Sequence, residues 1–139
     1  MSHRPSPRAV AEAFSRALDR SDYAAVRALL APDCAHDSEG VIRSGPDAVL
    51  ESYAARSRWA ERQFDEVRYE SEVVGESGRR VTVRSTNYLL KVPGRWHRHR
   101  SEQDIDVDDD GRVARIVHRV IDQEEQRLAE FLRTAGIQT

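Results

Sequence analysis

Histidines and other proton-carrying side chains gather in residues 95–121, which read as two antiparallel strands joined at Asp109-Asp110-Gly111. Because strand side chains alternate between two faces, the first strand presents one face made of His97, His99, Ser101, Gln103, Ile105 and Val107. A loop of two or four residues would add Ala114, Ile116, His118 and Val120 to the same face. Imidazole groups titrate near neutral pH, so this face could carry acid–base chemistry.

This face is too polar for one that only packs against a core. A buried polar group without a partner costs about 1–3 kcal/mol, so purely structural faces are made of Val, Ile, Leu and Phe. The opposite face of the first strand carries Arg98, Arg100, Glu102 and Asp104 and is expected to meet water. The pattern therefore predicts an inner cavity that holds a ligand or water.

His118 is the strongest single candidate, because it interrupts an apolar alternation and would face Ser101 or Gln103 across the hairpin. The alternative is a core histidine whose nitrogens are satisfied by those neighbours. His97 and His99 could form an acid–base pair or be exposed near a turn. Together with His36 and His118 they could also form a zinc-like site, although no compact H-x-x-x-H or H-E-x-x-H motif is present.

Length and composition indicate one soluble domain over residues 1–139, with residues 1–5 as a loose tail. Charged residues make up 33% and hydrophobic residues 39%, without an apolar run of the ~20 residues that a membrane span needs. The start of the chain lacks the apolar core of a secretory signal, and Cys34 is the single cysteine. We therefore expect a cytoplasmic protein without a membrane partner. The net charge of -2 argues against nucleic acid as a partner.

The remaining elements are expected to enclose the cavity. Helices are predicted after a Ser6 cap, between a Ser21 cap and Pro32, from a turn at residues 41–46 to about Arg62, and after an Asp122 cap with Glu125 in a capping box. Strands are predicted at residues 34–38, 67–74 and 80–92. The candidates for the cavity wall on these elements are Phe14, His36, Tyr53, Trp59, Ser85 and Asn87.

Several short segments carry a resemblance to a known family. They are residues 13–18 with Asp22, Leu29-Leu30-Ala31-Pro32-Asp33, Gly45 with Tyr53, and Asp110-Gly111-Arg112-Val113. In the residues of these segments and in their order, the chain resembles the SnoaL-like branch of the nuclear transport factor 2-like superfamily. The resemblance implies an α+β, cystatin-like fold: a cone-shaped barrel in which a curved antiparallel sheet wraps around three N-terminal helices, with a C-terminal helix. Such folds include ketosteroid isomerases, polyketide cyclases, dehydratases, epoxide hydrolases and non-catalytic proteins, so function stays open.

The resemblance also assigns roles to single positions. Phe14 stands where ketosteroid isomerases have an oxyanion-hole tyrosine, and Gln103 where they have a protonated aspartate, so steroid isomerisation is not expected. The general-base aspartate corresponds to Asp37 or Ser38. Simple alternation turns Asp37 away from His36, and a bulge could turn it inward. Tyr53 matches a tyrosine that lines the pocket.

We expect cofactor-free acid–base chemistry, namely isomerisation, cyclisation or dehydration, on a hydrophobic small molecule with a carbonyl or hydroxyl group. The expected catalytic residues are His118, His99 and Asp37. The expected substrate-binding residues are Phe14, His36, Tyr53, Trp59, Asn87, His97, Ser101, Gln103 and Ile116. The alternatives are a non-catalytic ligand-binding or dimerisation module and a histidine metal site. The resemblance further implies a homodimer through the outer face of the sheet.

Overall fold

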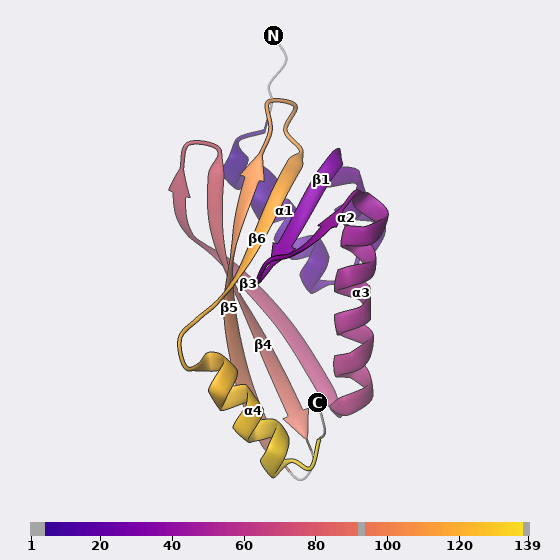
Figure 1. Cartoon of the computed structure of the whole chain (residues 1–139), viewed down its shortest axis with the longest axis vertical. Helices are drawn as coiled ribbons and strands as arrows, with labels where there is room; N and C mark the ends of the chain where they lie inside the picture. The colour runs from indigo at the N-terminus through magenta and orange to yellow at the C-terminus, as the bar shows by residue number, and fades with distance from the viewer. Residues whose placement is uncertain (1–4, 92–93, 138–139) are drawn as a thin grey trace.

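The computed structural model describes residues 5–91 and 94–137, which form four helices and one six-stranded sheet. In chain order the elements are α1 (Pro7–Asp19), α2 (Tyr23–Leu29), β1 (Leu30–Ser38), β2 (Val41–Ser44), α3 (Pro46–Gln63), β3 (Glu66–Ser77), β4 (Arg80–Lys91), β5 (Arg95–Val107), β6 (Val113–Val120) and α4 (Glu124–Thr134). The long strands cross the whole molecule, with α1 and α3 on one face and α4 over the far end of β5 (Figure 1).

The sheet has the strand order β2-β1-β6-β5-β4-β3 and does not close into a barrel. β1 pairs with β6 in parallel, whereas the other neighbouring strands are antiparallel. The sheet is therefore mixed, whereas a wholly antiparallel sheet was expected. Helix α1 packs against β3, β4 and β5, and α3 packs against β1. The predicted α+β, cystatin-like class is confirmed, and its concave face is the one that carries the candidate histidines.

The first two helices begin at side-chain caps. Ser6 Oγ accepts a hydrogen bond from the backbone N–H of Ala9 at 3.1 Å, as predicted for α1. The cap of α2 is Asp22 and not Ser21, since Asp22 Oδ1 accepts from the N–H of Ala25 at 3.2 Å. Helix α2 also ends before the predicted stop at Pro32. The proline disfavours helical backbone in the residue before it, so the chain is already extended there and belongs to β1.

Two further local predictions were wrong. The segment Val41–Ser44 is an edge strand and not a turn; its side chains are exposed, so it has no burial pattern to reveal it. The hairpin turn before it, Glu39-Gly40, has positive φ at both residues, as tight hairpin turns require. Helix α4 begins without a side-chain cap hydrogen bond, so the predicted Asp122 capping box does not form.

Instead of a cap, tertiary contacts hold α4 against β5. The Nε of Arg100 donates to Glu124 Oε1 at 2.7 Å, and the Glu124 side chain is only 3% exposed. Burial alone would raise the pKa of Glu124, but the hydrogen bond and charge of Arg100 outweigh it and lower the pKa. His97 stacks on Phe131 of α4, with ring centroids 4.8 Å apart. Helix α4 is therefore fixed over the end of the long hairpin.

The hairpin of β5 and β6 has the predicted pairing over most of its length, with Gln103 opposite His118 and Ile105 opposite Ile116. A bulge near the turn shifts this register, so that Val107 pairs with Val113. Val113 is consequently fully buried, whereas alternation had placed it outside and Ala114 inside. The largest fully buried side chains of the core are Phe14, Ile105, Ile116, His36, Val26, Val49, Val81, Val83 and Val113.

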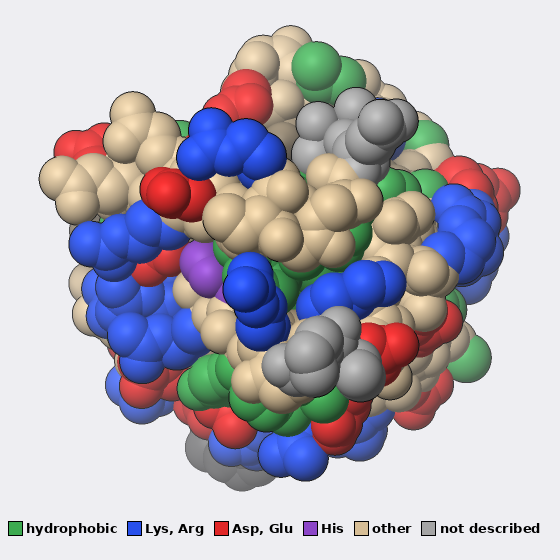
Figure 2. Space-filling model, turned by 90° about the horizontal axis from the view of Figure 1, so that it is seen from below, with side chains coloured by type: hydrophobic (Ala, Val, Ile, Leu, Met, Phe, Trp, Pro, Cys, Tyr) green, Lys and Arg blue, Asp and Glu red, His purple; other side chains and the backbone are tan. Residues whose placement is uncertain are grey.

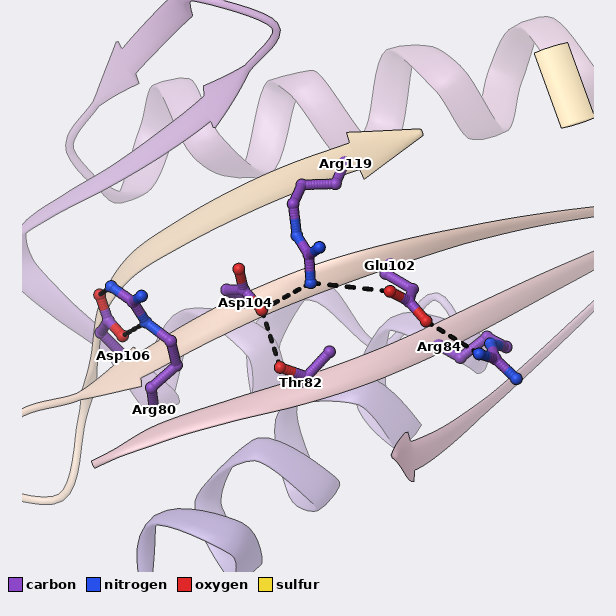
Figure 3. Close-up of polar contacts among 7 residues, drawn as sticks. All are labelled: Arg80, Thr82, Arg84, Glu102, Asp104, Asp106 and Arg119. Atoms are coloured by element: carbon purple, nitrogen blue, oxygen red, sulfur yellow. Dashed lines mark hydrogen bonds and ion pairs between the residues drawn. The ribbon is translucent and has the colours of Figure 1, made fainter. Parts of the chain in front are cut away.

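The outer face of the sheet carries a network of charged side chains (Figure 3). Its contacts join Arg80 to Asp106, Thr82 and Arg119 to Asp104, and Arg84 and Arg119 to Glu102. Exposed ion pairs of this kind contribute about 0.2–1 kcal/mol each, so the network of charged side chains adds little stability. It does confirm that the even-numbered residues of β5 face outward, which leaves the odd-numbered residues for the interior.

Candidate functional site

A cavity of about 590 Å³ lies between the concave face of the sheet and α1, α3 and α4. Seen from the end that carries α4, apolar side chains lie inside a hollow with basic side chains and a histidine at its edge (Figure 2). The wall carries many residues that could do chemistry, among them Ser38, Tyr53, Arg56, Ser57, Ser85, Asn87, His99, Ser101, Gln103, His118 and Glu125. The wall therefore mixes proton carriers with hydrogen-bonding groups.

The structure brings seven of the expected site residues together in this wall. They are Tyr53, Trp59, Asn87, His99, Ser101, Gln103 and His118. Five others lie outside it: Phe14, His36, Asp37, His97 and Ile116. The seven come from α3, β4, β5 and β6, so only the folded sheet and helix assemble them.

His118 is one of the residues that line the cavity. It stands opposite Gln103 in the antiparallel register, and the hydroxyl of Tyr53 donates to Gln103 Oε1 at 3.4 Å. His118 Nδ1 is buried without a hydrogen-bond partner in the part of the chain that the structure describes. Burial, followed by the positive charge of Arg56, lowers the pKa of His118 to about 4. His118 is therefore a neutral imidazole near pH 7 and able to accept a proton.

Tyr53 and Arg56 lie one turn apart on α3, so both reach the same wall. Burial raises the pKa of the Tyr53 hydroxyl, which keeps its proton available for donation at neutral pH. Arg56 Nη2 donates to Ser38 Oγ at 3.4 Å. Sequence reasoning missed Arg56; its spacing from Tyr53 along the helix was the one signal that could have indicated it.

His99 forms a second polar group on the wall together with a residue of α4. Its Nε2 lies 3.5 Å from Glu125 Oε1, and its Nδ1 is buried without a hydrogen-bond partner among residues 5–91 and 94–137. Asn87 stands opposite His99 in the neighbouring strand. Glu125 had been assigned to a helix cap, so its place beside His99 was not foreseen. A carboxylate next to an imidazole can orient the ring through a hydrogen bond.

Four of the expected binding residues lie behind or beside the cavity. His36 is 0% exposed, and its ring meets the ring of Tyr53 edge to face at 5.3 Å. Phe14 also contacts Tyr53 edge-on, at 6.3 Å, from within the core. Ile116 is fully buried in the same core, and the ring of His97 stacks on the ring of Phe131. These residues support the wall without lining it.

Asp37 lies on the outer side of β1. Its Oδ1 accepts from the N–H of Gly40 at 3.0 Å, and its Oδ2 accepts from Arg115 at 3.3 Å. The register shift in β1 lies between Leu30 and Ala35, so no bulge turns Asp37 inward. Ser38, the alternative position for the base of the resembled isomerases, is the residue that lines the cavity.

The four strand histidines do not converge on one point. Within the described ranges, no three His, Cys, Asp or Glu side chains are grouped so that they could hold a metal ion. His97 faces Phe131, and His36 lies in the core behind Tyr53. The histidine metal site considered from the sequence therefore has no set of ligands in this arrangement.

The burial of His36 predicts a specific loss of stability in acid. Burial and nearby arginines lower its folded pKa from 6.5 to about 4, so between these values the unfolded chain binds a proton that the folded chain does not. Stability then rises with pH across this window, by on the order of 3 kcal/mol for this group. We expect His36→Leu to lose correspondingly less stability than wild type between pH 7 and pH 4 in urea unfolding. An equal loss of unfolding free energy in wild type and variant would contradict the lowered pKa of His36.

Comparison with known proteins gives the family. The SnoaL-like domain family model matches residues 11–122, whereas no protein of curated function matches the chain. No helix in the described part of the chain is long and apolar enough to cross a membrane.

Solved structures share the fold at low sequence identity. TerC, co-crystallized with polyporic acid, is 16% identical with a TM-score of 0.69, over 90% of this chain and 99% of that chain. An inferred polyketide cyclase of Pseudomonas putida KT2440 is 17% identical, with a TM-score of 0.65 over 87% and 96%. An NTF2-like protein of unknown function from Burkholderia pseudomallei K96243 is 23% identical, with a TM-score of 0.63 over 89% and 92%. These likenesses show the fold alone, and with the family match over most of its length the chain belongs to the SnoaL-like domain family.

Proposed function

We propose that this protein is a small-molecule enzyme that carries out cofactor-free acid–base chemistry on a hydrophobic substrate with a carbonyl or hydroxyl group. The observation that carries the proposal is His118, whose neutral imidazole lies in the wall of a cavity of about 590 Å³. Cavities of roughly 300–1,000 Å³ are usual for small-molecule sites. The reaction would be an isomerisation, a cyclisation or a dehydration.

His118 acts as the base in this proposal. It accepts a proton from a carbon next to the substrate carbonyl, and the electron pair of the broken C–H bond moves toward the carbonyl oxygen. Tyr53 and Gln103, which already contact each other through Tyr53 Oη and Gln103 Oε1, orient that oxygen. The protonated His118 then returns its proton, either to another carbon or to a departing hydroxyl group.

His99 serves as the second proton-transfer group, and Glu125, whose Oε1 lies 3.5 Å from His99 Nε2, orients its ring. Asn87, opposite His99 in β4, adds a hydrogen-bonding side chain to the same wall, and Ser101 lies two residues further along β5. Trp59, Leu89 and Leu128 provide the apolar part of the wall. Asp37 has no part in this scheme, because Gly40 and Arg115 hold its carboxylate outside the cavity.

Family membership and the similar structure of TerC, co-crystallized with polyporic acid, support a small organic ligand. The test is to incubate the purified protein with extracts of small carbonyl and hydroxyl compounds and to follow them by untargeted mass spectrometry. A compound that disappears while an isomer, or a product lighter by one water, accumulates is the expected result. Extracts that stay unchanged, although compounds bind in native mass spectrometry, would contradict an enzyme.

A non-catalytic ligand-binding module is the second candidate function. The position of Asp37 favours it, since the carboxylate that resembles the base of the isomerases lies outside the cavity. The same incubation separates the two functions, because a binding module would retain its ligand unchanged.

We also propose a homodimer through the outer face of the sheet, where Trp96 is 48% exposed beneath the guanidinium of Arg68. The arginines of the network of charged side chains already have carboxylate partners within the chain, so apolar contacts would have to stabilise the dimer. A cytoplasmic location, expected from the sequence, stays a prediction.

A further inference from the structure

We propose that the ligand of the cavity carries a carboxylate group and that Arg56 binds it, with Ser38 beside it. This inference rests on the proposed function, because it names the class of substrate for the same cavity. It adds a binding residue that neither the sequence pattern nor the resemblance assigned.

Arg56 lines the cavity at a solvent-exposed position of α3 and has no anionic partner among the described residues. Its one hydrogen bond, to Ser38 Oγ, is long at 3.4 Å, and it forms no ion pair with a carboxylate of the described residues. Arg58, two residues later on α3, is paired with Glu51 at 2.6 Å. An arginine offers five N–H donors in a planar fork that matches a carboxylate, so most of the donors of Arg56 remain for a ligand.

The groups around Arg56 also offer donors. Ser38 Oγ accepts from Arg56, so its own hydrogen remains to be donated. The carbonyl oxygen of Gln103 accepts from Tyr53, so its amide N–H groups remain for a ligand. A ligand at this wall must therefore supply acceptors, and a carboxylate supplies two oxygens with negative charge.

None of the acidic side chains that line the cavity forms an ion pair with Arg56 in the described part of the chain. Asp19 Oδ2 accepts from Ser71 Oγ at 2.6 Å, and Glu125 lies beside His99. Glu39 is exposed at the turn between β1 and β2, and it forms no ion pair within the described ranges. After burial, which is the main cause, the positive charge of Arg56 also lowers the pKa of His118 in the cavity wall.

The strand register connects the carboxylate site to the proposed base. Ser38 stands opposite His118 in the parallel pairing of β1 and β6. A carboxylate held by Arg56 and Ser38 would therefore place the adjoining carbon atoms of the ligand next to the imidazole. Arg56 would bind the substrate and also fix its orientation toward His118.

The test compares two probes of the same shape, 2-naphthoate and the neutral 2-naphthamide, by isothermal titration calorimetry at pH 7. We expect wild type to bind 2-naphthoate at least about tenfold more tightly than the amide, since a hydrogen-bonded charge is involved. Arg56→Gln should lose this preference. The matched control Arg58→Gln, on the same helix but outside the cavity wall, should keep it.

Equal affinity for the two probes, a preference that survives Arg56→Gln, or no binding of either probe would overturn the carboxylate inference. None of these results affects the proposed acid–base function. That function fails on a different observation, namely substrate conversion that does not depend on His118.

Discussion

Replacing His118 by asparagine lowers the rate of substrate conversion by about 100- to 10,000-fold, the range typical for loss of a general acid–base group. Asparagine keeps a polar side chain of similar size in the cavity wall, but it cannot accept the proton. The rate is to be measured with a substrate found by incubation, and circular dichroism should show an unchanged fold. The wild-type rate should also fall as the pH drops through about 4, because protonation then removes the neutral base.

His97→Asn is the matched control for this variant. His97 lies two residues from His99 on β5, but it stacks on Phe131 outside the cavity wall. Its replacement should leave conversion within a few-fold of wild type, whereas His118→Asn should nearly abolish it. Normal conversion by His118→Asn would remove His118 from the mechanism.

Replacing Phe14 by alanine lowers the free energy of unfolding by about 3–5 kcal/mol. Phe14 is 0% exposed and lies in the main core, so truncation leaves a cavity that the rigid sheet cannot fill. Its ring also contacts the edge of Tyr53, so the loss should loosen a wall of the cavity. Urea unfolding of wild type and variant measures the difference.

Trp96→Ala provides the comparison for this stability measurement. Trp96 is large and aromatic too, but it is 48% exposed on the outer face of β5. Its replacement should cost far less than that of Phe14. Similar losses for the two variants would contradict the packing described for the core.

The site residues that could be predicted from the sequence are those whose positions follow from the alternation of side chains along a strand. Alternation along β5 correctly predicted that His99, Ser101 and Gln103 share a face, and the hairpin geometry added His118 from β6. The same rule failed at Val113, where a bulge next to the turn reverses the alternation. A bulge has no reliable sequence signal here, so its effect appears only in the folded sheet.

The residues that were missed reach the cavity through tertiary packing. Arg56 and Glu125 lie on α3 and α4, and their positions depend on where these helices cross the sheet. His97 shares the face of His99, yet α4 covers it through Phe131. Periodicity within a strand cannot reveal which end of a face a distant helix will cover.

The most direct test of the account is the titration of the histidine side chains by ¹⁵N NMR, with His118 assigned through His118→Asn. Burial of the His118 imidazole, together with the charge of Arg56, lowers its pKa, so His118 should titrate near 4 and remain neutral at pH 6. Titration of His118 near the ordinary value of 6.5 would show that it is solvated and would contradict the proposed base.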